Sequence, residues 1–392
     1  MTRQIWGIVA LITAIQFFNI IDFMIVMPLG PDFAHAFGTP VDRVPWVAAA
    51  YILTAALTAF ASARYLDRFR RRPLLVGILL GLATAEAMAS LSPNFNTLLA
   101  CRALAGVFGG LASSLSMAII SESVPPAYRG RAMGYTGSAF ALSSIIGVPL
   151  GLELAMTGSW KAPFWTLAAV MLLMALATRL ALPDAPAPPR RPWPGTWQFI
   201  KRPKTLYAYA LLASVSGGSF LLIPSFATFM QFNLDFPRER MSEIYFVAGA
   251  ATLVAQQIAG WALDRYPMVI VAWVGFACIA VSLIGGFITD PAWLSIWIVF
   301  PLFMVSGAAR IVAANTASSL VPAAHERAAH MALQGSIRHG CSGMAAFASS
   351  LILTVNPDGT LNNVGLLASV TLLVALAQPL IMARLEPMLD RR

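Results

Sequence analysis

The chain has 392 residues, of which 58% are hydrophobic and 11% are charged, and its formal net charge is +9. So small a polar fraction cannot cover the surface of a soluble globule of this length, and the apolar surface must face lipid. The composition therefore excludes a soluble globular protein and predicts an all-α polytopic membrane protein.

Twelve apolar stretches are each long enough to cross a bilayer core, which needs about 20 residues as a helix. The first stretch is too long, and lacks the small-residue cleavage site, to be a removed signal peptide. In the seventh stretch Pro224 predicts a bend, because proline frees a backbone carbonyl. In chain order the stretches are 5–29, 44–63, 74–91, 95–120, 132–154, 162–182, 206–232, 242–263, 268–288, 293–320, 331–355 and 361–381.

The chain repeats itself at an offset of 197 residues. Asp67-Arg68 and Asp264-Arg265 are that far apart, and so are Val124-Pro125 and Val321-Pro322. Two matches in register indicate duplication, and duplicated halves are typical of secondary transporters. We expect two pseudo-symmetric six-helix bundles, at residues 1–182 and 205–392, joined by a linker at 183–204 that is rich in Pro and Arg.

The distribution of Lys and Arg predicts the orientation. Of the 26 basic residues, 19 fall in the N-terminus, the even-numbered loops with the helix ends beside them, and the C-terminus. This bias predicts that both termini and the linker are cytoplasmic. We expect a protein of the bacterial inner membrane whose basic loops contact lipid phosphates, and the bias argues against nucleic acid as a partner.

The sequence carries no pattern for a metal, a cofactor or an enzyme. Cys101, Cys278 and Cys341 lie far apart within apolar stretches, and the four histidines form no metal-binding motif. A Gly-rich phosphate loop is also absent, so we expect no enzyme and no ATP-driven pump. Any driving energy must then come from an ion gradient.

Three ionisable residues within the first four predicted helices are candidates for proton coupling. Asp22 and Arg102 each lie about seven residues from the outer end of their stretch, so they share a level and can pair. A helix movement that parts them would change the proton affinity of Asp22. The alternative is a static ion pair. Glu86 is either a second proton site or a carboxylate that faces a water-filled crevice.

The second half supplies candidate substrate contacts. Arg310 and Arg338 share a level without a comparable acidic residue, which suggests an anionic group of the substrate between the halves; the alternative is snorkelling toward the headgroups. Phe18, Met24 and Phe229 would make an adaptable pocket for an amphipathic molecule if they face the central cavity. The alternative is that they face lipid or other helices.

Five segments carry a resemblance to a known family. Residues 63–73 resemble the loop 2–3 signature of the major facilitator superfamily, although Ala63 and Arg70 replace two of its glycines. Leu99-x-x-Arg102-x-x-x-Gly106 resembles its helix 4 signature, and Gly147-Val148-Pro149-Leu150-Gly151 resembles its antiporter signature. Residues 18–23 and 46–51 are similar to the sugar and drug exporters of this superfamily. The likeness is to the 12-helix drug:proton antiporter group, which includes arabinose-type efflux permeases.

The resemblance implies gating roles for the loop and glycine motifs. Asp67 and Arg68, with Asp264 and Arg265 as their repeat, would latch the two halves; the alternative is an anchor that only sets topology. Gly147, Pro149 and Gly151 would pack helix 5 tightly and limit leakage through the closed carrier.

We therefore expect a monomeric secondary transporter that couples proton entry to the export of a small organic molecule by alternating access. An importer or uniporter of a sugar, amino acid or metallophore is the first alternative. A sensor or scaffold that transports nothing is a further one, and family likeness does not choose the substrate.

Overall fold

The computed structural model describes residues 3–62, 69–125, 128–184, 201–289, 294–322, 327–356 and 359–389. Within these residues, eleven helical spans are long and apolar enough to cross a membrane. The helix α15 (Arg327–Ile352, 26 residues) occupies the place of the predicted eleventh stretch and is more polar than the others. The predicted all-α polytopic membrane fold is confirmed.

The first half begins its helices where the local sequence favours a start. The side chain of Asn94 caps α5 by accepting a hydrogen bond from the backbone N–H of Thr97. In chain order the elements are α1 (Arg3–Ile25), α2 (Gly30–Phe37), η1 (Val41–Arg43), α3 (Pro45–Ser62), α4 (Arg71–Ser90), α5 (Phe95–Ser123), α6 (Arg129–Leu142), the π-turn η4 (Ser143–Gly147), α7 (Val148–Gly158) and α8 (Lys161–Ala181).

The second half repeats this order with one break that the sequence predicts. Pro224 lies in a short 3-10 turn that divides the seventh stretch into two helices. The elements are α10 (Pro203–Leu222), η5 (Ile223–Ser225), α11 (Phe226–Phe232), η6 (Arg238–Arg240), α12 (Met241–Leu263), α13 (Met268–Leu283), the π-turn η7 (Ile284–Ile288), α14 (Ile296–Ser319), α15, β1 (Thr354–Val355), β2 (Leu361–Asn362), α16 (Val364–Leu385) and η8 (Glu386–Met388).

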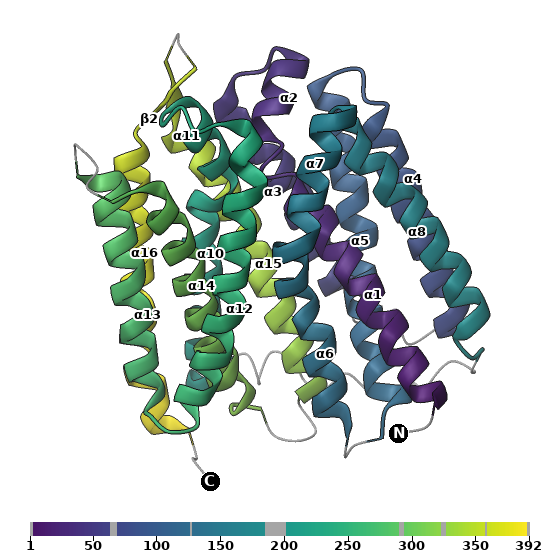
Figure 1. Ribbon diagram of the computed structural model, residues 1–392. Helices are drawn as coiled ribbons and strands as arrows, with labels where there is room; N and C mark the ends of the chain where they lie inside the picture. Colours follow the sequence, from purple (N-terminus) through teal and green to yellow (C-terminus); the bar gives the residue numbers. More distant parts are fainter. Residues whose placement is uncertain are drawn as a thin grey trace.

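The two halves stand side by side, and both chain ends lie at the same end of the molecule (Figure 1). We call that end the termini side and the opposite end, which carries α2 and α11, the far side. The most extensive contacts between the halves are made by α3 against α15 and by α12 against η4 and α7. The predicted linker at 183–204 lies mostly outside the described residues, so its boundaries stay a prediction.

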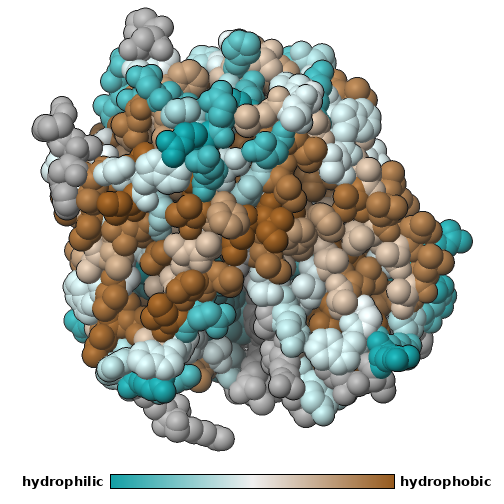
Figure 2. Space-filling view, viewed as in Figure 1, coloured by the Kyte–Doolittle hydropathy of each residue, from teal (hydrophilic) through white to brown (hydrophobic). Residues whose placement is uncertain are grey.

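Apolar side chains cover the middle of the molecule. In the space-filling view they form a broad zone, and hydrophilic residues gather at the two ends (Figure 2). Large side chains such as Leu57, Leu180, Leu351 and Leu373 are more than half exposed, as expected where a helix faces lipid. The same view shows a hollow between the halves near the termini side.

A small hairpin at the far side was not predicted from the sequence. The antiparallel strands β1 and β2 pair Thr354 with Asn362 and Val355 with Leu361, where the eleventh and twelfth stretches were expected to continue as helix. The side chain of Asn233, directly after α11, donates to the backbone carbonyl of Leu361 and accepts from its N–H, both at 2.9 Å. The hairpin is thereby attached to the end of the broken seventh span.

Candidate functional site

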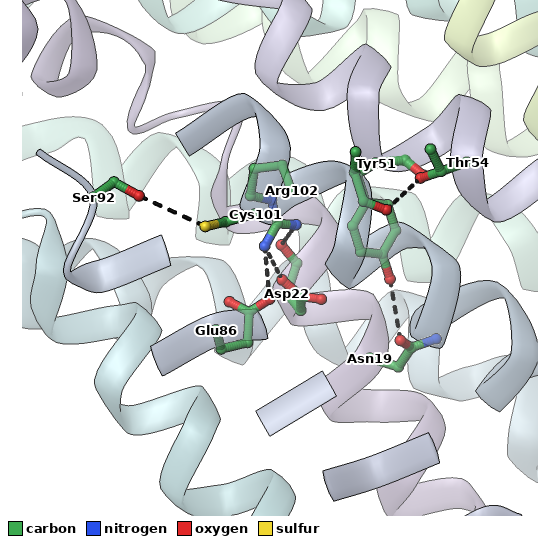
Figure 3. A network of polar contacts seen from close by, with 9 residues as sticks. Asn19, Asp22, Tyr51, Thr54, Glu86, Ser92, Cys101 and Arg102 are labelled. Atoms are coloured by element: carbon green, nitrogen blue, oxygen red, sulfur yellow. Dashed lines mark hydrogen bonds and ion pairs between the residues drawn. The ribbon is translucent and has the colours of Figure 1, made fainter. Parts of the chain in front are cut away.

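A buried cluster of three charges lies in the first half, near the far side (Figure 3). Arg102 Nη1 donates to Asp22 Oδ1 at 2.6 Å and to Glu86 Oε1 at 2.8 Å, and Arg102 Nη2 donates to the backbone carbonyl of Asp22 at 3.2 Å. All three side chains are 0% exposed. We call Asp22, Glu86 and Arg102 the triad.

Three different helices bring the triad together. Asp22 lies three residues before the end of α1, Glu86 lies four residues before the end of α4, and Arg102 lies seven residues after the start of α5. Because α1 ends at Ile25 and not at the expected position 29, Asp22 is nearer to the far side than the sequence predicted. Glu86 lies on the same level and faces no crevice in this structure, since its side chain is fully buried.

The charges of the triad do not balance. Two carboxylates and one guanidinium carry a formal net charge of −1 when all are ionised, and burying an uncompensated charge in an apolar interior is costly. Asp22 Oδ2 and Glu86 Oε2 accept no hydrogen bond from the described residues.

A second polar network touches the triad through Tyr51 on α3. The centre of the Arg102 guanidinium lies 4.8 Å from the centroid of the Tyr51 ring. The Tyr51 hydroxyl donates to Asn19 Oδ1 at 3.1 Å (Figure 3). Asn19 Nδ2 donates to Ser113 Oγ at 2.9 Å. This network joins α1, α3 and α5 one turn from Asp22.

The two halves are closed against each other at the far side. Arg238 Nη2 lies 2.8 Å from Asp32 Oδ1, and the Trp46 indole donates to Ser350 Oγ at 2.6 Å. Ser242 on α12 donates to Glu153 on α7. Burial raises the pKa of Asp32 above its ordinary value, although the nearby Arg238 guanidinium acts to lower it.

Two glycines let the halves approach closely below these polar contacts. A Cβ on Gly249 of α12 would lie 2.9 Å from the backbone N of Ile145 in η4. A Cβ on Gly343 of α15 would lie 2.7 Å from Leu53 Cγ on α3. At Gly249 the neighbouring atoms are backbone, so the approach of α12 to η4 depends on the missing side chain; at Gly343 the nearest neighbour is the Leu53 side chain.

The glycine motif of the fifth span packs inside the first half. A Cβ on Gly147 or Gly151 would lie within 2.4 Å of the side chains of Ile21 or Ile25 on α1. Pro149 stands in the first turn of α7, directly after the π-turn. The motif therefore fixes α7 against the helix that carries Asp22, and its expected role in limiting leakage stays a prediction.

Met24 and Phe18 lie on the same helix as Asp22. The Met24 side chain is buried and accepts a hydrogen bond from Ser144 Oγ at 3.7 Å. Phe18 is half-buried and stacks edge-on with Phe17 at 5.0 Å. Their expected contact with substrate stays a prediction.

The structure does not bring the second-half candidates together. Arg310 is 0% exposed and lies inside the second bundle, where its Nε donates to Gln378 Oε1 on α16 and its Cγ would meet a Cβ on Gly275 of α13. Arg338 is half-buried on α15. Phe229 lies on α11 and packs on Phe287 at 4.8 Å. A shared anion site for the two arginines stays a prediction.

The first loop motif lies partly beyond the described residues, which exclude Asp67 and Arg68. The basic residues after them pair within the first half: Arg70 and Arg72 bind Asp184, and Arg71 makes a two-point contact with Glu122. In the second half, the Arg265 guanidinium lies 4.2 Å from the Trp261 ring centroid, and Asp264 follows the end of α12. The expected latch between the halves stays a prediction for both loops.

Three residues at the site have no assigned role in the sequence analysis. Tyr51 stood within a segment similar to exporters, but only the fold shows that its ring covers Arg102. Asn19 is a polar residue within a transmembrane helix, a signal that already marks it for attention. Phe220 on α10 stacks on Phe23 across the two halves at 5.7 Å, and no sequence pattern announces that contact.

Comparisons with known proteins agree with this architecture. The chloramphenicol resistance protein of Streptomyces lividans is 26% identical over 360 residues, covering 89% of this chain and 88% of its own. A chloramphenicol efflux pump of Mycobacterium tuberculosis is 34% identical over 136 residues, which cover 34% of this chain and 32% of its own.

The fold also matches a solved structure along its whole length. A bacterial homologue of the human lysosomal transporter Spinster, in an inward-facing and unoccupied conformation, superposes with a TM-score of 0.68 over 99% of this chain and 96% of its own, at 14% identity. The profile of the Major Facilitator Superfamily matches residues 12–346. The chain therefore belongs to the Major Facilitator Superfamily, and it is an integral membrane transporter and not an enzyme.

Proposed function

We propose that this transporter exports a small amphipathic organic molecule in exchange for protons, and that the triad is the proton site. The observation that carries the proposal is the full burial of Asp22, Glu86 and Arg102 with one negative charge in excess. In a membrane interior, ionisable groups are rare and mark ion pathways. A group that must gain or lose one proton to be stable there is suited to coupling.

The coupling follows from the position of the triad. It lies within a few residues of the far-side ends of α1, α4 and α5, and in this structure the far side is closed above it. When the halves tilt apart at the far side, water reaches the triad and a proton enters. When they close again, the protonated triad is shut off from the far side, and the proton leaves once water reaches the triad from the termini side.

The direction of transport rests on the orientation and on the relatives. With the termini in the cytoplasm of a bacterium, as the positive charges predict, the far side faces outward and protons enter there. Two relatives are named for chloramphenicol, a neutral amphipathic molecule, which makes chloramphenicol the first compound to test. Phe23, which follows Asp22 in the sequence, and Phe220, which stacks on Phe23, are aromatic residues that suit such a molecule.

Transport into inverted membrane vesicles tests the proposal. A growth-protection screen across toxic compounds, beginning with chloramphenicol, identifies a transported compound, and its labelled form is then followed with and without an imposed pH gradient. We expect accumulation that needs the gradient and that a protonophore abolishes. Asp22→Asn and Glu86→Gln should each lose gradient-driven accumulation but keep exchange of labelled for unlabelled compound.

Gradient-driven accumulation at the wild-type level in both variants would remove the triad from the proton pathway. Uptake by the wild-type protein that ignores the gradient and stops at equal concentrations would instead indicate a uniporter. The exchange reaction serves as the control, because a variant that fails to fold loses exchange as well.

A further inference from the structure

A row of stacked rings connects the surface between the halves to the triad. Phe220 on α10, in the second half, stacks on Phe23 of α1 at 5.7 Å with an interplanar angle of 30°. Phe23 in turn lies 5.9 Å from Tyr51 on α3, again at 30°. The centre of the Arg102 guanidinium lies 4.8 Å from the same Tyr51 ring. The first contact of this row joins different halves, and the others lie within one.

We infer that Tyr51 is the positioning residue through which closure of the far side sets the proton affinity of the triad. The inference rests on the proposed proton coupling and adds the residue that links conformation to protonation. In this role Tyr51 neither binds the substrate nor carries the transferred proton. It acts by holding the guanidinium that both carboxylates bind.

The helix α5 packs closely against Tyr51. A Cβ on Gly109 would lie 2.1 Å from the Tyr51 hydroxyl oxygen, and a Cβ on Gly106 would lie 2.2 Å from its backbone carbonyl oxygen, so α5 presses directly on α3 here. The hydroxyl is also tied to Asn19. Phe23 is the neighbour of the Tyr51 ring that also contacts the second half.

Opening or closing of the far side therefore acts on the Tyr51 ring through Phe23. With the far side closed, Phe220 holds Phe23 against Tyr51, and Tyr51 covers Arg102. When the halves part, Phe220 leaves with the second half and Phe23 loses a neighbour. Tyr51 is then free to shift, the guanidinium follows, and the balance between Asp22 and Glu86 changes.

A double-mutant cycle on protonation tests this without a transport assay. Infrared difference spectroscopy follows the carbonyl band of protonated carboxyl groups during a pH titration of the purified protein. The band is assigned by its loss in Asp22→Asn and Glu86→Gln. The titration is done on the wild-type protein and on Gly249→Val, in which the side chain at position 249 prevents closure against η4.

With Tyr51 unchanged, we expect the proton affinity of the triad to differ by about tenfold or more between the wild-type protein and Gly249→Val. This corresponds to a shift of about one pH unit in the titration midpoint. In Tyr51→Leu the difference should fall below about twofold. Tyr51→Phe keeps the ring and loses only the bond to Asn19, so it should keep most of the difference. Phe220→Leu interrupts the same row of rings from the second half without changing a residue that contacts the triad. It should also abolish the difference in proton affinity between the open and closed proteins.

A full wild-type difference in both Tyr51→Leu and Phe220→Leu would overturn the inference and leave the proposed function standing. If the wild-type protein and Gly249→Val titrate alike, the conformational coupling itself is wrong, and the proposed function fails with it. Tyr51→Phe provides a folded comparison should Tyr51→Leu prove unstable.

Discussion

Gly249 offers the sharpest test of whether this structure is one state of a rocking cycle. Substitution to Ala places a Cβ 2.9 Å from the backbone N of Ile145 and 2.9 Å from the backbone C of Ser144, on the other half of the molecule. Backbone atoms cannot turn aside as side chains do. The clash exists only while the far side is closed, so Gly249→Ala should shift the population toward the open state.

The size of the shift follows from the usual penalty for overpacking. An extra methyl group in a well-packed contact costs about 1–3 kcal/mol, which corresponds to a roughly 5–150-fold change in the ratio of the two states. Spin labels at Ala36 and Glu239, which are both exposed on opposite halves of the far side, report the separation by pulsed electron resonance.

A matched control lies on the same helix. A Cβ on Gly260 meets nothing within 4 Å, so Gly260→Ala raises helix propensity by the same amount without touching the other half. We expect wild-type distances in Gly260→Ala and a second, longer distance in Gly249→Ala. A single wild-type distance in both would refute the view that α12 and η4 separate during the cycle.

Three further expectations follow. Burial raises the pKa of Asp32 in the closed state, so closure takes up a proton that the water-exposed open state lacks. Lowering the pH from the raised pKa toward the ordinary pKa should therefore favour the closed state. The distance between the same spin labels should lose this pH dependence in Asp32→Asn. Gln378→Leu removes the acceptor of the buried Arg310 Nε and should cost about 1–3 kcal/mol; the melting temperature in detergent should fall well below that of Gln257→Leu, an exposed position. Arg71→Lys replaces the two-point contact with Glu122 by a single one, and exchange of amide hydrogens at the start of α4 should speed up, whereas unchanged exchange would mean that the pair contributes nothing.

The fold was largely predictable because lipid imposes a simple length rule on apolar stretches. Each of the twelve stretches overlaps helix, and the interruption at Pro224 follows from proline chemistry. The misjudged details lie at the far-side ends: α1 stops at Ile25, and the chain after α15 forms a hairpin. At these ends the helical periodicity fades, and tertiary hydrogen bonds such as those of Asn233 decide the path.

The candidate site was predictable only as a set of residue types. A charge inside an apolar stretch is visible in the sequence, and Asp22 and Arg102 were matched by counting residues to the helix ends. Glu86 joins them because the crossing of α4 and α5 places its side chain there, which no linear count supplies. Arg310 shows the opposite limit, because its rotation toward α13 and α16 depends on the space beside Gly275.

The hairpin offers a way to restrain the broken seventh span from the far side of the molecule. Because Asn233 ties β2 to the end of α11, any molecule that grips residues 354–362 also restrains the broken seventh span. An antibody fragment raised against this loop would slow the movement of the seventh span without entering the space between the two halves.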